Sequence, residues 1–278
     1  NIHGIYTEAT RIVSPTSVEI KMGHFQQRGF NFAATGDTLS VVDKSSFKTT
    51  HSLVVKSIDK VNNKYYRLNF YTDISKIIGE GTLFDNMSWY PEVLIRNNKA
   101  INNRARAFLI ATPKKVIIEN NTFSNMMSAI LMDEFNWWYE AGHPSDVTIR
   151  NNTFLDCTYG GGNNAIIHIN TSAKGLVQNI FIVNNKFNSF DPFVLHAEGV
   201  SNLHFSDNEI TQSNNYPVLN GKNPVLSLPG SSGLRIINNK YKGDAKLFIR
   251  PEQVNDKMDV VQNNLLNGKK IPKAGSSK

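Results

Sequence analysis

The chain has 278 residues, of which 40% are hydrophobic and 19% are charged, so it can bury a sizeable core and is not disordered as a whole. It has no apolar run of about 18 residues, which excludes a membrane-spanning helix. Its one cysteine, Cys157, excludes a disulfide scaffold within the chain and a cysteine-based zinc site. The net charge of +7 comes from scattered basic residues, so we expect a solvated surface and no nucleic-acid partner.

Asparagine is the unusual component of this sequence, with 35 residues, and it recurs in a fixed phrase. The pattern apolar-x-apolar-x-Asn-Asn-x-apolar occurs seven times, with Asp207 once replacing the first asparagine. Successive copies are 23 to 33 residues apart, which is a period typical of solenoid proteins. The second asparagines of the pairs are Asn98, Asn121, Asn152, Asn185, Asn208, Asn239 and Asn264.

The phrase predicts a β-strand that ends in a bend. Its apolar residues alternate with period two, and a second apolar stretch follows each of several copies, as in AILMDE at 129–134, AIIHIN at 165–170 and FVLHAE at 193–198. Two or three short strands per coil, stacked coil on coil, form a right-handed parallel β-helix, an all-β solenoid like that of pectate lyases. Asparagine tolerates the left-handed backbone of a bend, and stacked amides can hydrogen-bond as a ladder.

Residues 37–84 interrupt this rhythm. They contain alternating runs and no asparagine phrase in register, which predicts an antiparallel β-barrel or sandwich inserted into the β-helix, and we expect the barrel. The expected organisation is therefore a β-helix formed by 1–36 and 85–268, a barrel at 37–84, and a flexible basic tail at 269–278.

The segment 132–146 is the best candidate for chemistry, because it combines carboxylates with aromatic rings. Asp133, Glu134 and Glu140 lie near Trp138 in its sequence. Hydrolysis of a glycosidic bond needs one carboxylic acid to protonate the leaving oxygen and a second carboxylate that either activates water or attacks the sugar itself. The alternative is a packed loop whose carboxylates are merely solvated.

Two further clusters are candidates for sugar binding. His24 and Gln26 lie on an alternating run, and Arg104 and Arg106 alternate so that both are expected on one face of a strand. Ordinary strand surface or a surface salt bridge is the alternative for each. His3, His168 and His196 are weaker candidates, since a lone histidine on a strand is more often structural. No phosphate-loop, HExxH or EF-hand motif occurs, so no cofactor or metal is expected.

Several phrases occur together in a characteristic order: MGHFQQRGF, GDT, NNRARAFLI, VIIENNTFSNMMSAIL, WYEAG and DVTIRNNTF. In this combination the sequence resembles the bacterial exo-α-1,3-galactosidases of glycoside hydrolase family 110, most closely over about residues 1–160. The resemblance implies a right-handed β-helix with inserted β-barrels that removes terminal α-1,3-linked galactose with inversion. It also implies a periplasmic, cell-surface or secreted bacterial protein.

The sequence departs from the family pattern in two places. Family chains are much longer, with an acidic pair just upstream of the His-Gly motif, whereas this chain starts at Asn1 within that motif. We therefore expect a fragment, the C-terminal part of such a protein, without one catalytic carboxylate. The acidic loop before WYE is one residue shorter than in the family, so the matching residue is either Asp133 or Glu134.

The leading hypothesis is an inverting exo-α-galactosidase that acts on glycans with terminal α-galactose. Asp133 and Glu134 are then the acid/base candidates, and Trp138 stacks on the sugar ring. Substrate-binding roles fall to His3, His24, Gln26, Arg104, Arg106 and Glu140. A non-catalytic carbohydrate-binding β-helix and, less favoured, a polysaccharide lyase are the alternatives, and a homo-oligomer is left open.

Overall fold

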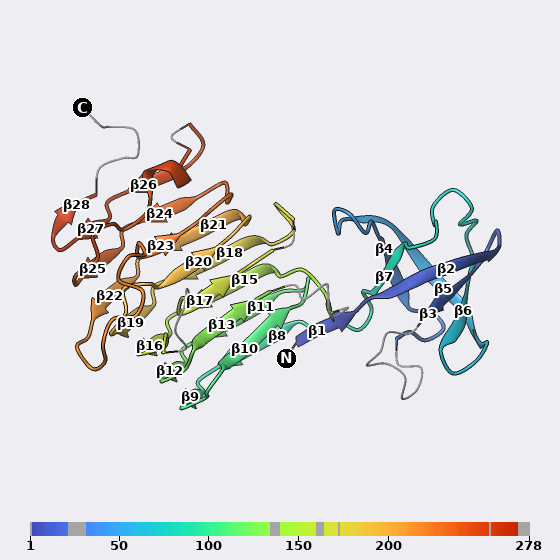
Figure 1. Cartoon of the computed structure of the whole chain (residues 1–278), viewed down its shortest axis with the longest axis horizontal. Helices are drawn as coiled ribbons and strands as arrows, with labels where there is room; N and C mark the ends of the chain where they lie inside the picture. Colours follow the sequence, from blue (N-terminus) through green and yellow to red (C-terminus); the bar gives the residue numbers. More distant parts are fainter. Residues whose placement is uncertain are drawn as a thin grey trace. The chain divides into compact units, whose positions relative to one another are not determined.

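The computed structural model describes residues 2–21, 32–133, 140–159, 164–171, 173–255 and 257–271. The chain divides into two compact units: one comprises residues 1–2, 91–133 and 143–278, and the other residues 3–90 and 134–142. Strands dominate both units (Figure 1). Among the described residues the one helical element is the short 3-10 helix η3 (Pro251–Gln253) in the larger unit.

The larger unit is a parallel β-helix with three sheets, and each of its first five coils contributes one strand to each sheet (Figure 1). The asparagine phrases supply the first sheet, which contains β8 (Val93–Arg96), β11 (Val116–Glu119), β15 (Ser145–Arg150), β18 (Gln178–Val183), β21 (Ser201–Ser206), β24 (Arg235–Ile237) and β26 (Val260–Gln262). The residues after each asparagine pair form the second sheet, which contains β9 (Lys99–Ile101), β12 (Thr122–Ser124), β16 (Thr153–Leu155), β19 (Lys186–Ser189), β22 (Glu209–Gln212), β25 (Lys240–Lys242), β27 (Leu265–Leu266) and β28 (Lys269–Lys270).

The second apolar stretch of the coils forms the third sheet. Its strands in this unit are β10 (Arg106–Ala111), β13 (Ser128–Met132), β17 (Ile167–Ile169), β20 (Leu195–Ala197) and β23 (Leu226–Ser227). Equivalent residues of successive copies pair in parallel and in register, as Val116 does with Val93 on one side and Val147 on the other. The repeat therefore fixes the register, because a shift of one residue would turn the apolar side chains outward.

Stacked aromatic rings fill the core beneath the second sheet. Phe154 lies between Phe123 and Phe187, with ring centroids 5.0 and 4.7 Å away and nearly parallel planes. All three rings are at most 1% exposed. Equivalent positions of the repeat therefore carry the same side chain in successive coils, one strand spacing apart. The phenylalanine rings stack because the coils that carry them are stacked in register.

The predicted asparagine ladder is present at the bend between the first and second sheets. The first residue of each pair, Asp207 included, has a left-handed backbone with φ between 54° and 59°. The second residue accepts a hydrogen bond through its side-chain oxygen from the backbone N–H of the equivalent asparagine in the preceding coil, as Asn152 does from Asn121 at 2.9 Å. The same contact, at 2.9–3.0 Å, joins every neighbouring pair from Asn98 to Asn264. From Asn121 onward these side chains are at most 1% exposed, whereas Asn98 in the first coil is exposed.

The smaller unit contains a closed antiparallel barrel in the order β2-β3-β6-β5-β4-β7. Its strands are β2 (Thr7–Ser14), β3 (Ser17–Lys21), β4 (Thr38–Val42), β5 (Thr49–Lys60), β6 (Tyr65–Phe70) and β7 (Leu83–Asn86). Alternating residues of these strands form a separate apolar core around Val18, Leu68 and Phe84. The carboxylate of Glu19 pairs with the guanidinium groups of Arg11 at 2.6 Å and Arg67 at 3.3 Å.

The barrel begins earlier than the sequence indicated. Residues 1–36 were expected in the β-helix, but β2 and β3 lie within them and belong to the barrel. The alternation in these strands is the same for either fold, and only the long-range pairing of β3 with β6 assigns them to the barrel. The expected basic tail also begins with structure, since Lys269 and Lys270 pair with β27. In the described ranges, no helix has the length and apolar character needed to cross a membrane.

The ladder yields a test of stability. Asn152 also donates to the carbonyls of Ile118 and Arg150, so Asn152→Ala leaves several buried backbone groups without partners. We expect the free energy of unfolding of the β-helix to fall by about 2–5 kcal/mol. Urea unfolding followed by circular dichroism measures this change.

The neighbouring residue is the matched control. Asn151 has the left-handed backbone that glycine adopts freely, and its side chain joins only the exposed contact with Asn184. Asn151→Gly should therefore cost less than about 1 kcal/mol. Equal losses in the two variants would contradict the assignment of the ladder as the stabilising element.

Candidate functional site

The third sheet carries a row of polar side chains on its outward face. Ile130, Ile167 and Leu195 pair in register and are fully buried in the core, so the residues that follow them point outward. These are Leu131, His168 and His196. The two imidazole rings pack against each other, with centroids 4.7 Å apart and planes inclined by 33°.

A second outward column begins where the strands end. The backbone N–H of Asn170 donates to the carbonyl of Met132, and the N–H of Glu198 donates to that of Ile169, so parallel pairing continues past β13, β17 and β20. This pairing places Asp133, Asn170 and Glu198 on successive coils. The carboxylates and the amide therefore lie beside the histidine pair on one face of the sheet.

Asn170 connects the two columns. Its Nδ2 donates to Asp133 Oδ2 at 3.1 Å, and its side chain favours the protonated form of the neighbouring His168. Nδ1 of His168 is buried without a hydrogen-bond partner among the described residues. An amide that donates to a carboxylate favours its ionised form.

Both histidines of this face are neutral at neutral pH. Burial, reinforced by the neighbouring His196, lowers the pKa of His168 to about 4, although its bond to Asn170 and the charges of Asp133 and Glu198 oppose this. Burial also lowers the pKa of His196. The Nε2 atom of His196 is 3.9 Å from Glu198 Oε2, which is too long for a hydrogen bond. An ion pair would require a protonated ring, and the lowered pKa of His196 disfavours that form. A neutral imidazole can both donate and accept, as sugar hydroxyls also can.

The smaller unit holds another buried carboxylate, Asp85. The hydroxyl of Tyr90 donates to its two oxygens at 2.8 and 3.0 Å. Burial and the charge of Asp85 raise the pKa of Tyr90, so the phenol stays protonated and acts as the donor. The ring of Tyr90 occupies the place that a Cβ would take at Gly4, within β1 (Ile2–Ile5). The glycine of the NIHG phrase is thus required by this close approach.

The predicted sugar-binding residues are distributed between the two units. Glu140 is half-buried in β14 (Glu140–Ala141), which pairs with β1, the strand that contains His3. Arg104 precedes β10, so it does not share a strand face with Arg106 as expected. Arg106 pairs with Ser128, about 16 Å along the strand from the position of Asp133. The structure therefore does not bring Arg106 to the Asp133 cluster.

Four of the predicted residues lie outside the described residues. These are His24, Gln26, Glu134 and Trp138.

The residues around Asp133 include two histidines, His168 and His196, which the sequence favours as structural, and Asn170 and Glu198, which the sequence pattern does not indicate as candidates. Part of the signal was present, because AIIHIN and FVLHAE place the two histidines at one position and Asn170 and Glu198 two residues later. Aligned from its first residue, AILMDE places Glu134 opposite Asn170, and only the register of the third sheet, which pairs Leu131 with His168, moves Asp133 to that position.

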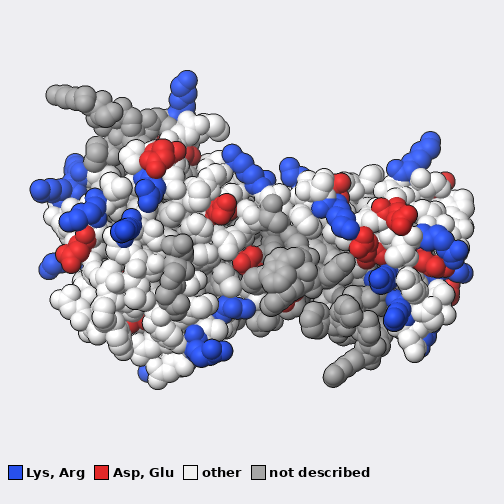
Figure 2. Space-filling model, in the orientation of Figure 1, with Lys and Arg blue, Asp and Glu red and all other residues white. Residues whose placement is uncertain are grey.

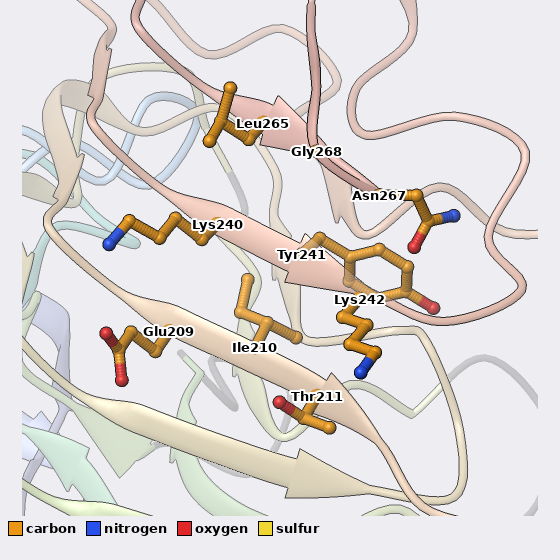
Figure 3. Close-up of a pocket in the computed structure, with 9 residues that line it drawn as sticks. All are labelled: Glu209, Ile210, Thr211, Lys240, Tyr241, Lys242, Leu265, Asn267 and Gly268. Atoms are coloured by element: carbon orange, nitrogen blue, oxygen red, sulfur yellow. The ribbon is translucent and has the colours of Figure 1, made fainter.

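A hollow of about 450 Å³ lies over the second sheet near its C-terminal end. Figure 3 shows Glu209 and Lys240 on one side of it and Thr211 and Lys242 on the other, with Ile210 and Tyr241 between them. Its lining contains one carboxylate, that of Glu209. A single carboxylate does not supply the pair that glycoside hydrolysis requires, so the Asp133 cluster is the better candidate for an active site.

Charge is mixed on the visible surface. Basic and acidic side chains are interspersed on the face shown in Figure 2. Among the described residues, no group of three or more His, Cys, Asp or Glu side chains is arranged to hold a metal ion. The polar groups of the third sheet thus offer hydrogen bonds and negative charge to a ligand.

The fold defines the class of this protein. A family model described as "right handed beta helix region" matches residues 83–270, and the chain belongs to this family. A second model, "GLAA-B beta-barrel domain II", matches residues 17–83, which lie largely in the barrel. The expected right-handed β-helix with a barrel insertion is thereby confirmed.

The curated relatives of the chain share one named activity, which is more specific than the fold family. The chain is 33% identical over 254 residues to alpha-1,3-galactosidase A of Bacteroides fragilis, with 88% of this chain and 42% of the relative aligned. It is 29% identical to alpha-1,3-galactosidase B of Bacteroides thetaiotaomicron and 30% identical to alpha-1,3-galactosidase A of Shewanella woodyi, over 88% and 78% of this chain. These alignments cover 41% and 36% of the two relatives. The chain thus spans about two fifths of the length of the relatives it matches, and the resemblance to α-1,3-galactosidases is confirmed.

The lowered pKa of His168 gives a prediction for pH. An unfolded histidine titrates near about 6.5, so between that pH and about 4 the unfolded chain binds a proton that folded His168 does not. Stability should therefore fall as the pH falls through this window. The neighbouring His196 lowers the pKa of His168 further, whereas the charges of Asp133 and Glu198 raise it.

NMR of the His168 Cε1–H resonance measures the midpoint directly. We expect it near pH 4, and urea unfolding of a His168→Asn variant should depend less on pH between 4 and 6.5 than the wild type does. A midpoint near 6.5 would contradict the burial of this ring.

Proposed function

We propose that this chain provides the sugar-binding face and a catalytic carboxylate of an exo-acting α-1,3-galactosidase. The observation that carries the proposal is Asp133, which lies on the outward face of the third sheet and accepts a hydrogen bond from Asn170 beside two neutral histidines. The three relatives described above are named α-1,3-galactosidases, which supports the same reaction.

The proposed mechanism is inverting hydrolysis. Asp133 acts as the base, because the Asn170 amide stabilises its ionised form, and it takes a proton from the water that attacks the anomeric carbon. A second carboxyl, which the proposal assigns to Glu134, protonates the leaving oxygen. The two carboxyls of an inverting enzyme are about 6.5–9.5 Å apart, which leaves room for the water.

The remaining residues bind the sugar. His168 lies beside Asn170, which bonds to Asp133, so it is a positioning residue, and His196 and Glu198 offer hydrogen bonds to hydroxyls of the substrate beyond the terminal galactose. Trp138 is assigned to stacking and Glu140 to a hydroxyl. Because the glycans that such an enzyme cleaves lie outside the cell, the proposal includes a periplasmic, cell-surface or secreted protein.

Replacement of Asp133 tests the proposal. Asp133→Asn keeps the shape of the side chain and its ability to accept from Asn170 but removes the base, so turnover should fall by about 10²–10⁴-fold while the fold is retained. The measurement is galactose release from a terminal α-1,3-galactoside, with the protein as its gene encodes it, and a circular dichroism spectrum for the fold.

Asp207→Asn is the matched control. It makes the same change of charge at a bend where the other six copies of the phrase already carry asparagine. Its turnover should equal that of the wild type. Near-normal turnover of Asp133→Asn would overturn the role of this residue, and galactose binding with no turnover in the wild type would identify a carbohydrate-binding β-helix instead.

A further inference from the structure

The polar face of the third sheet extends in one direction from Asp133. Toward the preceding coil, the paired positions are Leu109 and Ala111, both 2% exposed and without polar side-chain atoms. Toward the following coils, the columns continue through His168 and Asn170. Among the described outward positions of β10, β13, β17 and β20, a ligand that extends beyond Asp133 therefore finds hydrogen-bonding groups on the side of β17 and β20.

The spacing of these groups suits a chain of sugars. Successive strands are about 4.8 Å apart, close to the length of one sugar unit in an oligosaccharide, so β17 and β20 each supply one set of contacts. The first set is His168 with Asn170, and the second is His196 with Glu198. In the second set the side chain of Glu198 is 58% exposed and that of His196 is 18% exposed. A partly exposed ring beside an exposed carboxylate can contact both a C–H face and a hydroxyl.

The charges on this face select against acidic sugars. The outward positions from β13 to β23 carry Asp133 and Glu198 but no lysine or arginine. The two histidines add no positive charge at neutral pH, because burial lowers both pKa values. A sulfate or carboxylate on a bound sugar would therefore meet like charge without a cation to offset it.

We propose, on the basis of the galactosidase function above, that this face binds the acceptor part of the substrate. The substrate is an uncharged oligosaccharide of at least about three sugar units, with its terminal galactose at Asp133 and its chain running along the β-helix toward β20.

Calorimetric titration of the full chain tests the binding surface without relying on catalysis. The probes are galactose, a neutral linear tetrasaccharide ending in α-1,3-galactose, and the same tetrasaccharide sulfated on an internal unit. We expect the neutral tetrasaccharide to bind at least about tenfold more tightly than galactose, and the sulfated form to lose most of that gain. Equal affinities for galactose and the neutral tetrasaccharide, or for the two tetrasaccharides, would overturn the proposal.

Variants locate the contacts. His196→Ala and Glu198→Gln should each lower the ratio of tetrasaccharide to galactose affinity by about three- to tenfold, since each removes a polar contact from the second set only. His204→Ala is the matched control, because His204 packs on Phe181 in the first sheet, and it should leave the ratio unchanged. An unchanged ratio in both His196→Ala and Glu198→Gln would place the acceptor elsewhere.

The two proposals fail in distinguishable ways. Tight, length-dependent binding without galactose release would overturn the hydrolase function and support this surface as a glycan site. Galactose release at the same rate from aryl galactoside and tetrasaccharide, with no length dependence of binding, would support the hydrolase and overturn the acceptor surface.

Discussion

Each coil of the β-helix must turn sharply between its first and second sheets, and at that bend the backbone would otherwise bury unpaired polar groups. The asparagine pairs solve both parts of this problem. The first residue adopts the left-handed conformation that the turn requires, and the side chain of the second satisfies the backbone of the neighbouring coil. Since an unsatisfied buried amide costs about 1–3 kcal/mol, a stack of such bends is stable only if nearly every coil carries the pair.

The rest of the larger unit follows from this regular bend. Because the coils are in register, Phe123, Phe154 and Phe187 stack in the core, and the same register aligns His168 with His196 on the outside. The inward positions are committed to packing, whereas outward positions can vary without disturbing the ladder. A solenoid of this kind can therefore build an elongated binding face from one or two residues in each coil.

The Asp133 face depends on a balance between burial and charge. Burial keeps the two histidines neutral, so they can accept as well as donate hydrogen bonds. The amide of Asn170 meanwhile stabilises an anionic Asp133 next to them. A face with neutral rings and fixed carboxylates is suited to hydroxyl-rich, uncharged ligands, and this character arises from the surroundings of the side chains more than from their identities.

The sequence by itself determined the β-helix, the bend at each asparagine pair and the existence of an antiparallel insert, because each depends on local periodicity in the chain. It could not decide where the barrel begins, since the alternation of residues 7–21 suits a strand of either unit and only pairing with β6 assigns it. The sequence indicated Asp133 as a catalytic candidate because it lies in an acidic segment. It did not connect Asp133 with His168, Asn170 or Glu198, which are 35 to 65 residues away. Those residues become neighbours because the parallel strands pair in register, and the histidines are neutral because they are buried. Register and burial are both decided by the tertiary structure.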